Sequence, residues 1–63
     1  MQLRAARELS GKTQVQVAKE ANISEAQYQN IEYGKSEPSV RTAIRIADVL
    51  GVKSYEDFKK IFS

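Results

Sequence analysis

The sequence predicts an all-α protein, and three observations support that class. Apolar residues recur at the spacing of helices rather than at every second position. The chain has only one proline and three glycines to interrupt helices. No segment has the alternating β-branched residues that are typical of a strand. With 63 residues, the chain is expected to fold as a single small domain over residues 1–63.

The first expected helix runs from about Met1 to Leu9. Its apolar residues Leu3 and Ala6 should face the interior. Gly11 follows at the position where a left-handed residue commonly closes a helix, so we expect it to end this one.

A second helix is expected from Gln14 to Ala21, with Thr13 as its N-terminal cap. Gln16 lies three residues after Thr13, which is the spacing of a capping box. The apolar residues of this segment form one narrow stripe: Val17, Ala18 and Ala21.

The next segment predicts a tight turn and a third helix. Asn22 stands where the turn needs a positive φ, which asparagine tolerates better than most residues with a side chain, and Ile23 can fill the corner. Ser24 is expected to cap the third helix, with Gln27 at capping-box spacing, and Gly34 to end it. The result is two short helices joined by a three-residue turn.

A fourth helix is expected to begin at Val40, capped by Ser39, and to end before Gly51. One face of it carries residues that we expect to be buried: Ala43, Ile44, Ala47 and Leu50. Ile46 and Val49 lie off that stripe.

Ser54 is expected to cap a final helix, which has more apolar residues than one face needs: Tyr55, Phe58, Ile61 and Phe62. These side chains, together with Ile46 and Val49, could form a contact between two subunits. Alternatively, they pack on one another within a single chain. The sequence alone does not separate the two possibilities.

The third helix has an outer surface of uncommon composition. On a helical wheel Tyr28 and Ile31 define its inward face, and the opposite side is mostly small or amide-bearing: Ala26, Gln29, Asn30 and Tyr33. Carboxamides can pair with N6 and N7 of adenine in a major groove, and an alanine methyl can contact the methyl of thymine. The helix has no lysine or arginine, but phosphate contacts can come from its flanks, where Lys12, Lys35 and Arg41 lie. The alternative is that the amides only keep an exposed face soluble.

Composition argues against several classes of function. Ten basic and eight acidic side chains give a formal net charge of +2, which by itself does not indicate nucleic-acid binding. Without cysteine or histidine the chain lacks an ordinary nucleophile–base pair and a metal cluster, and it has no glycine-rich phosphate loop. We therefore expect no enzyme activity, no metal and no cofactor. No apolar run approaches the roughly 20 residues of a membrane span, and the start of the chain does not resemble a signal peptide. We expect a cytoplasmic protein with no membrane partner and no small-molecule substrate.

The segment "LRAARELSGKTQVQVAKEANISEAQYQNIEYGKSEPSVRTAIRIADVLGV" resembles the Cro and lambda-repressor-like (XRE-type) helix-turn-helix family of DNA-binding domains. The most telling parts, in order, are Thr13-Gln14, Val17-Ala18, Ile23-Ser24, Ile31-Glu32, Gly34-Lys35, Pro38-Ser39 and Ala47 to Gly51. The resemblance implies a compact five-helix domain whose second and third helices form the helix-turn-helix. It also implies a prokaryotic or phage-encoded protein.

In this family the second helix supports the third, whose N-terminal residues lie against base edges in the major groove. The resemblance implies DNA contacts by matching residues: Thr13, Gln14, Ser24, Glu25, Ala26, Gln29, Asn30, Tyr33, Lys35 and Ser36. Gln14 would hold a backbone phosphate through its side chain or amide, and Lys35 would contact the backbone beyond the third helix. Each has a structural alternative: Ser24 can be only a cap, Tyr33 can close the helix end, and Lys35 can be a solvated lysine.

Three charged residues carry further expectations from the resemblance. Glu25 stands where a basic or neutral residue is common, and we place its favourable interaction with the helix dipole ahead of a contact to a cytosine amino group. Arg7 and Glu32 match a pair that joins the first and third helices in relatives through a partly buried ion pair. The inward tilt of Glu32 on the helical wheel independently supports that pairing, so we expect both residues to be architectural.

The leading interpretation is a sequence-specific regulator of transcription, expected to be a repressor, that binds a double-stranded DNA operator. Members of the family usually bind as two-fold dimers on half-sites about 10–10.5 base pairs apart, so a homodimer is expected. The alternative is a protein-interaction module with the same fold, such as an antitoxin or an adaptor, because the net charge is low and Glu25 is acidic. The chain could also be the N-terminal part of a longer regulator.

Overall fold

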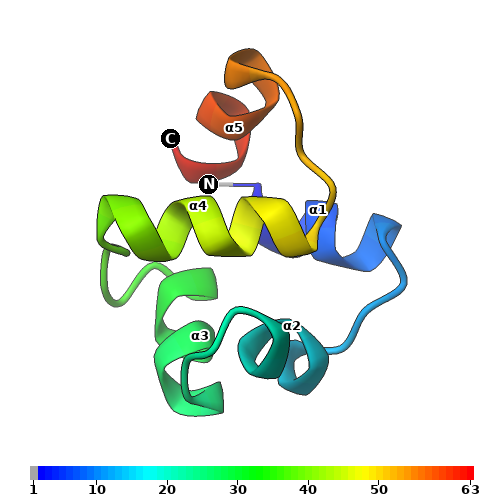
Figure 1. Ribbon diagram of the computed structural model, residues 1–63. Helices are drawn as coiled ribbons and strands as arrows, with labels where there is room; N and C mark the ends of the chain where they lie inside the picture. The colour runs from blue at the N-terminus through cyan, green and yellow to red at the C-terminus, as the bar shows by residue number, and fades with distance from the viewer. Residues whose placement is uncertain (1) are drawn as a thin grey trace.

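The computed structural model describes residues 2–63, which form five helices and, over that range, no strand (Figure 1). The helices are α1 (Leu3–Leu9), α2 (Gln14–Glu20), α3 (Glu25–Glu32), α4 (Val40–Val49) and α5 (Tyr55–Phe62). The expected all-α class and the order of the helices are therefore confirmed. Met1, where the first helix was expected to begin, lies outside the described residues.

The capping residues define the starts of four helices. Thr13, Ser24, Ser39 and Ser54 each accept a hydrogen bond from the backbone N–H three residues later. At Thr13 the capping box is complete, because Gln16 Oε1 also accepts from the Thr13 N–H at 2.8 Å. At Ser24 the serine half is present, with the Gln27 N–H donating to Ser24 Oγ at 3.0 Å.

The turn between α2 and α3 depends on a left-handed residue. Asn22 has a φ of 62°, as expected from the sequence. The N–H of Ile23 then donates to the carbonyl of Ala18, and that of Asn22 to Lys19, so the turn satisfies carbonyls that the end of α2 leaves free. Gly34 repeats this arrangement after α3, with a φ of 77° and a bond from the Lys35 N–H to the Asn30 carbonyl at 2.8 Å.

The core lies where α4 crosses the other helices (Figure 1). Its buried members come from all five helices and from the end of α2: Leu3, Val17, Ala18, Ala21, Tyr28, Ile31, Ile46 and Ile61. The start of the described chain joins α5, because the Gln2 N–H donates to the Ile61 carbonyl at 3.1 Å. The first and last of the described residues accordingly belong to segments that lie side by side.

The predicted inward face of α4 was wrong at three positions, Ile44, Ile46 and Val49. Ile44 is 51% exposed, whereas Ile46 is fully buried, and Val49 also packs against the core. The physical reason is that Ile44 and Ile46 are two residues apart, about 200° around a helix, so one face can bury only one of them. Ala43 and Ala47 are buried in either orientation and do not decide between the two.

Candidate DNA-binding interface

α2 and α3 pack on each other and, with the turn between them, form a helix-turn-helix unit at the lower end of the molecule in Figure 1. Tyr28 and Ile31 fix the rotation of α3, because both are buried in the core. The opposite side of α3 is consequently directed away from the interior. Ala26 and Asn30 are exposed, Tyr33 is 56% exposed, and Gln29 is half-buried. The outward orientation expected from the helical wheel is confirmed.

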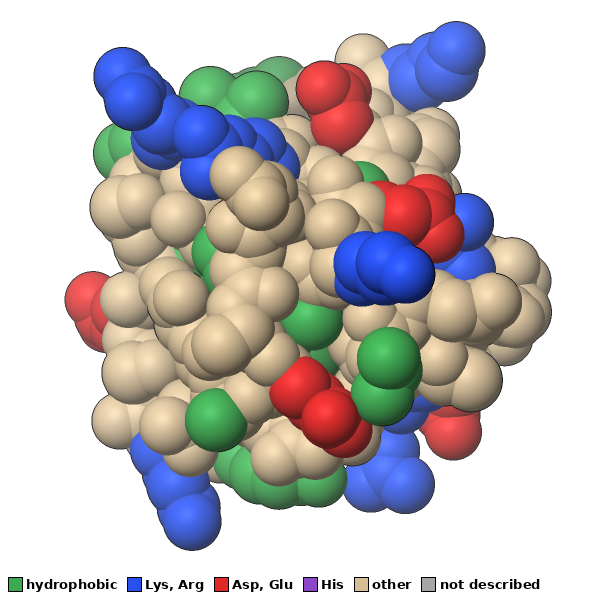
Figure 2. All heavy atoms as spheres, turned by 60° about the horizontal axis from the view of Figure 1, so that its bottom comes forward, with side chains coloured by type: hydrophobic (Ala, Val, Ile, Leu, Met, Phe, Trp, Pro, Cys, Tyr) green, Lys and Arg blue, Asp and Glu red, His purple; other side chains and the backbone are tan. Residues whose placement is uncertain are grey.

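The other residues expected to contact DNA surround this face. Thr13, Ser24, Glu25, Lys35 and Ser36 are exposed, and Gln14 is half-buried. Figure 2, turned so that the α2–α3 end comes forward, shows a face covered mostly by uncharged polar side chains and backbone. Most of its lysine and arginine side chains project from the margin. Some acidic, apolar and basic side chains also lie within the face (Figure 2). Uncharged polar groups therefore form most of the face, and positive charge is concentrated at its edge without being confined there.

A chain of side-chain hydrogen bonds connects α2 to α3, and no pattern in the sequence predicted it. Gln14 Nε2 donates to Glu32 Oε1 at 3.2 Å and to Tyr33 Oη at 3.3 Å. Gln29 Nε2 donates to Gln14 Oε1 at 3.3 Å and to Glu25 Oε2 at 3.1 Å. The side-chain N–H groups of Gln14 therefore already have acceptors. Its backbone N–H, at the first position of α2, has no partner within the helix and is the group better placed for a phosphate.

The inner end of this chain is the expected ion pair. Arg7 Nε lies 2.9 Å from Glu32 Oε2, Arg7 Nη2 donates to Glu32 Oε1 at 3.1 Å, and Arg7 Nη1 donates to the Lys12 carbonyl at 2.9 Å. The Glu32 side chain is 0% exposed, so the pair is buried at its acidic end. Hydrogen bonding to Glu32 raises the pKa of Arg7. Burial alone would raise the pKa of Glu32, but the hydrogen bonds and charge of its partners outweigh that effect and lower it.

Tyr28 lies beneath this ion pair. Burial raises the pKa of its hydroxyl, and the neighbouring Glu32 carboxylate raises it further, so the group stays protonated at physiological pH. Within residues 2–63 the hydroxyl oxygen makes no hydrogen bond. Its ring, rather than its hydroxyl, therefore holds α3 in the core.

The basic residues that precede α2 and those that follow α3 differ in whether their charge is paired within the protein. Lys12 Nζ lies 3.1 Å from Glu20 Oε1, so its charge is balanced by α2 and is less available to a phosphate than expected. Lys35 and Arg41 are exposed and form no ion pair within residues 2–63. The free positive charge next to α3 therefore comes from the side of the loop that follows it.

The fold and this surface define a class of protein, a lambda-repressor-like helix-turn-helix domain. A family model described as helix-turn-helix matches residues 3–57. The chain therefore belongs to the Cro/C1-type (XRE) helix-turn-helix family, a family of DNA-binding transcription regulators. Neither a comparison with curated proteins nor one with solved structures found a match.

Two features are absent from residues 2–63. In that range no helix has the length and apolar character needed to cross a membrane. The same residues contain no group of three or more His, Cys, Asp or Glu side chains that could hold a metal ion.

Proposed function

We propose that the chain binds an operator in double-stranded DNA and regulates transcription, acting as a repressor, with α3 in the major groove. The observation that carries this proposal is the orientation of α3, which holds Ala26, Gln29 and Asn30 on the outside of the helix-turn-helix. Small and amide-bearing side chains are suited to base edges, because the exposed carboxamide of Asn30 can donate and accept at once, the Gln29 oxygen can accept, and the Ala26 methyl group can contact thymine. The cytoplasm of a prokaryotic or phage-infected cell is the proposed site of action.

Affinity would come from phosphate contacts around this face. Lys35 and Arg41 supply positive charge after α3, and the N-terminus of α2 supplies backbone N–H groups through Gln14. Thr13, Ser24, Tyr33 and Ser36 add exposed hydroxyl groups at the edge of the same face. Such contacts fix the position of a protein on the duplex but do not read its sequence. Because the surrounding residues would contact the phosphates and α3 would contact the bases, α3 itself needs no lysine or arginine.

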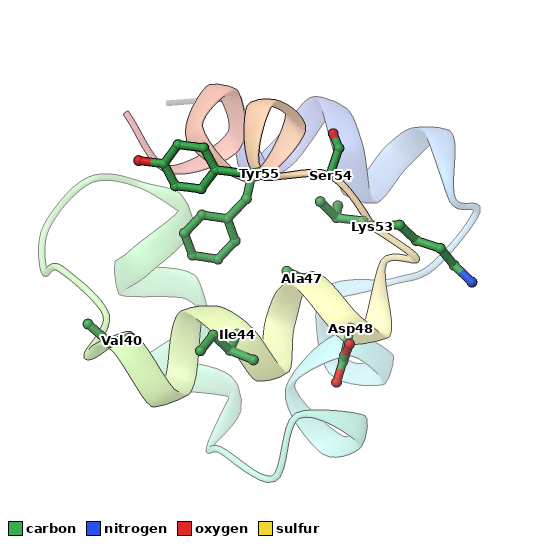
Figure 3. A pocket seen from close by; sticks show the side chains of 9 residues that line it. Val40, Ile44, Ala47, Asp48, Lys53, Ser54 and Tyr55 are labelled. Atoms are coloured by element: carbon green, nitrogen blue, oxygen red, sulfur yellow. The ribbon is translucent and has the colours of Figure 1, made fainter.

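We also propose that two copies bind one operator. The expected subunit contact cannot use Ile46, which is buried, but another apolar surface is exposed. Val40 is 76% exposed and Tyr55 73% exposed, and with Ile44 they border a hollow of about 360 Å³ between α4 and α5 (Figure 3). Asp48 and Lys53 carry opposite charges at its border, so a two-fold contact can place each beside the other on the partner subunit.

A second candidate is favoured by one observation. Glu25, an exposed carboxylate at the start of α3, weakens attraction to phosphates and suits a basic partner protein. A protein-interaction module such as an antitoxin or an adaptor would present the same helix to that partner. The two candidates differ in their response to salt, because each phosphate contact releases counterions whereas an apolar protein contact does not.

The deciding experiment selects bound duplexes from a random pool at low and moderate salt. The affinity of the chain for the most enriched duplex is then measured over a series of salt concentrations. The proposal predicts one enriched sequence with two-fold symmetry. It also predicts binding to this duplex at least about 1,000-fold tighter than to a scrambled one, and a logarithm of affinity that falls linearly with that of salt. A pool that remains random after selection would refute the proposal. Binding to a protein that is insensitive to salt would support the second candidate instead.

A further inference from the structure

The hydrogen-bond chain between α2 and α3 has a fixed direction. It begins and ends at a carboxylate, with Glu32 inside and Glu25 outside. Ionised carboxylates only accept hydrogen bonds, so each must face the nitrogen of the adjacent amide and not its oxygen. The Gln14 side chain therefore directs its nitrogen to Glu32 and its oxygen to Gln29. The Gln29 side chain directs its nitrogen to both Gln14 and Glu25.

This direction changes what Gln29 can offer a base. Reading adenine with a glutamine requires the amide to donate to N7 while it accepts from N6. Both N–H groups of Gln29 already have acceptors, at 3.3 and 3.1 Å, so adenine would have to displace a bond inside the protein. The group that remains is the oxygen of Gln29. It is an acceptor.

Glu25 adds further acceptors at the same place. It is the first residue of α3 and is exposed, and Gln29 holds its Oε2. Oε1 forms no hydrogen bond within residues 2–63. In the family's docking geometry the start of this helix lies nearest the bases. The side chains of Glu25 and Gln29 therefore present acceptor oxygens and no free N–H donor.

The four bases differ in the donors and acceptors that they would place against this surface in the major groove. Guanine shows only acceptors in the major groove, and adenine places its N7 acceptor next to its amino donor. A lone pair of either purine would therefore repel the Glu25 carboxylate. Thymine presents an acceptor and a methyl group. Cytosine presents its N4 amino donor alone, which makes it the base that matches. Repulsion of the other bases therefore adds to the discrimination that attraction to cytosine provides.

From this geometry we infer that Glu25 reads a cytosine in each half-site and that Gln29 is a positioning residue that fixes its carboxylate. The inference rests on the proposed function, because it needs α3 in a major groove. Interaction of Glu25 with the helix dipole, which the sequence suggested first, is compatible with this role, since both use the charge at the start of α3.

The test compares four chains on the same random duplex pool: the natural chain, Glu25→Gln, Gln29→Met and Glu56→Gln. Glu56 lies in α5, at the opposite end of the molecule from α3, so Glu56→Gln makes the same change in charge away from the proposed interface (Figure 1). For each chain, the base frequencies at every selected position are measured, and thermal melting reports whether the chain is folded.

The natural chain should select cytosine at one position of each half-site, by roughly 5- to 150-fold over the other bases. Glu25→Gln should change that position alone from cytosine to adenine. Gln29→Met should reduce the cytosine preference there and leave the other positions unchanged, and Glu56→Gln should leave every preference unchanged.

Two results would overturn the inference, and they are distinguishable. If the natural chain selects a sequence but Glu25→Gln keeps every preference, Glu25 does not read a base, although the proposed function stands. If the natural chain selects no sequence at all, both the inference and the proposed function fail. A Gln29→Met chain that melts normally and keeps the full cytosine preference would remove the positioning role of Gln29.

Discussion

The two ends of this small domain have opposite surfaces. At the α2–α3 end, most outward side chains are polar, and hydrogen bonds hold several of them to one another, as in the chain through Gln14 and Gln29. In the groove between α4 and α5, Val40, Ile44 and Tyr55 are large, apolar and exposed. The α2–α3 end exposes two large apolar side chains as well, Val15 and Tyr33, but they stand on a mainly polar surface, whereas those of the groove border one apolar hollow.

The difference indicates two kinds of partner. A fixed polar surface loses little side-chain freedom when it meets an equally polar base edge, which favours discrimination between sequences. An exposed apolar groove gains free energy when any complementary apolar surface covers it. We interpret the first surface as the one that reads DNA and the second as the one that joins two copies.

The largest expected effect tests what holds the polar end to the domain. Glu32→Ala leaves Arg7 partly buried without its carboxylate and should lower the free energy of unfolding by about 3–5 kcal/mol, as measured by urea denaturation. Glu8→Ala is the control, because the Arg4–Glu8 pair is exposed and its atoms lie 3.9 Å apart, so its loss should cost about 0–1 kcal/mol. Equal costs for the two variants would show that the buried pair is not what joins α1 to α3.

The next effect compares two isoleucines of one helix. Ile46→Ala should lower the free energy of unfolding by about 2–5 kcal/mol, because it opens a cavity in the core. Ile44→Ala should change it by less than about 0.5 kcal/mol and should instead weaken self-association, measured by analytical ultracentrifugation. Unchanged self-association in Ile44→Ala would exclude the α4–α5 groove as the subunit contact.

A smaller effect is expected at the polar surface itself. Asn30→Ala removes an exposed carboxamide of α3 and should reduce discrimination at one base position by roughly 1–3 kcal/mol, with little effect on stability. Competition binding with operators that differ at single positions measures the discrimination at each base position. Weakening that is uniform across all duplexes would count against a base-reading role for Asn30.

Acid should weaken the Arg7–Glu32 pair without a mutation. The pKa of Glu32 is lower in the folded chain than its usual 4.5, so the unfolded chain binds the proton more tightly. Its contribution to stability is complete above the unfolded pKa and is lost as the pH falls through the folded pKa. Urea denaturation of the natural chain and Glu32→Gln should show a stability difference that narrows on acidification below about pH 4.5. A difference independent of pH would contradict the lowered pKa.

The smallest effect concerns one phosphate contact. Lys35→Ala should weaken binding to all duplexes alike and reduce the slope of the logarithm of affinity against that of salt by about 1. A salt series with selected and scrambled duplexes measures both quantities. A loss confined to the selected duplex would assign Lys35 to base reading instead.

Local features of the sequence predicted most of the fold. The caps at Thr13, Ser24, Ser39 and Ser54, together with the left-handed Asn22, depend on residues within a few positions of one another, so spacing alone identifies them. The outward face of α3 was also predictable, because Tyr28 and Ile31 leave its rotation little freedom.

Features that join separate helices were harder to predict. The helical wheel of α4 allows two orientations, and only packing against α2 and the core decides that Ile46 rather than Ile44 is buried. The Lys12–Glu20 pair and the Gln14–Gln29 bond connect residues 8 and 15 positions apart. The first depends on how the segment before α2 lies along that helix, and the second on how α2 and α3 pack. Neither follows from periodicity.

The most direct measurement of the central claim is a nuclear magnetic resonance titration of the chain with its selected duplex, followed at every backbone amide and side-chain carboxamide. Insertion of α3 into the major groove should give the largest shifts along α3, at Ala26, Gln29 and Asn30, and at the start of α2, with little change around the α4–α5 groove beyond that caused by dimer formation. Shifts concentrated in that groove, with α3 unaffected, would contradict it.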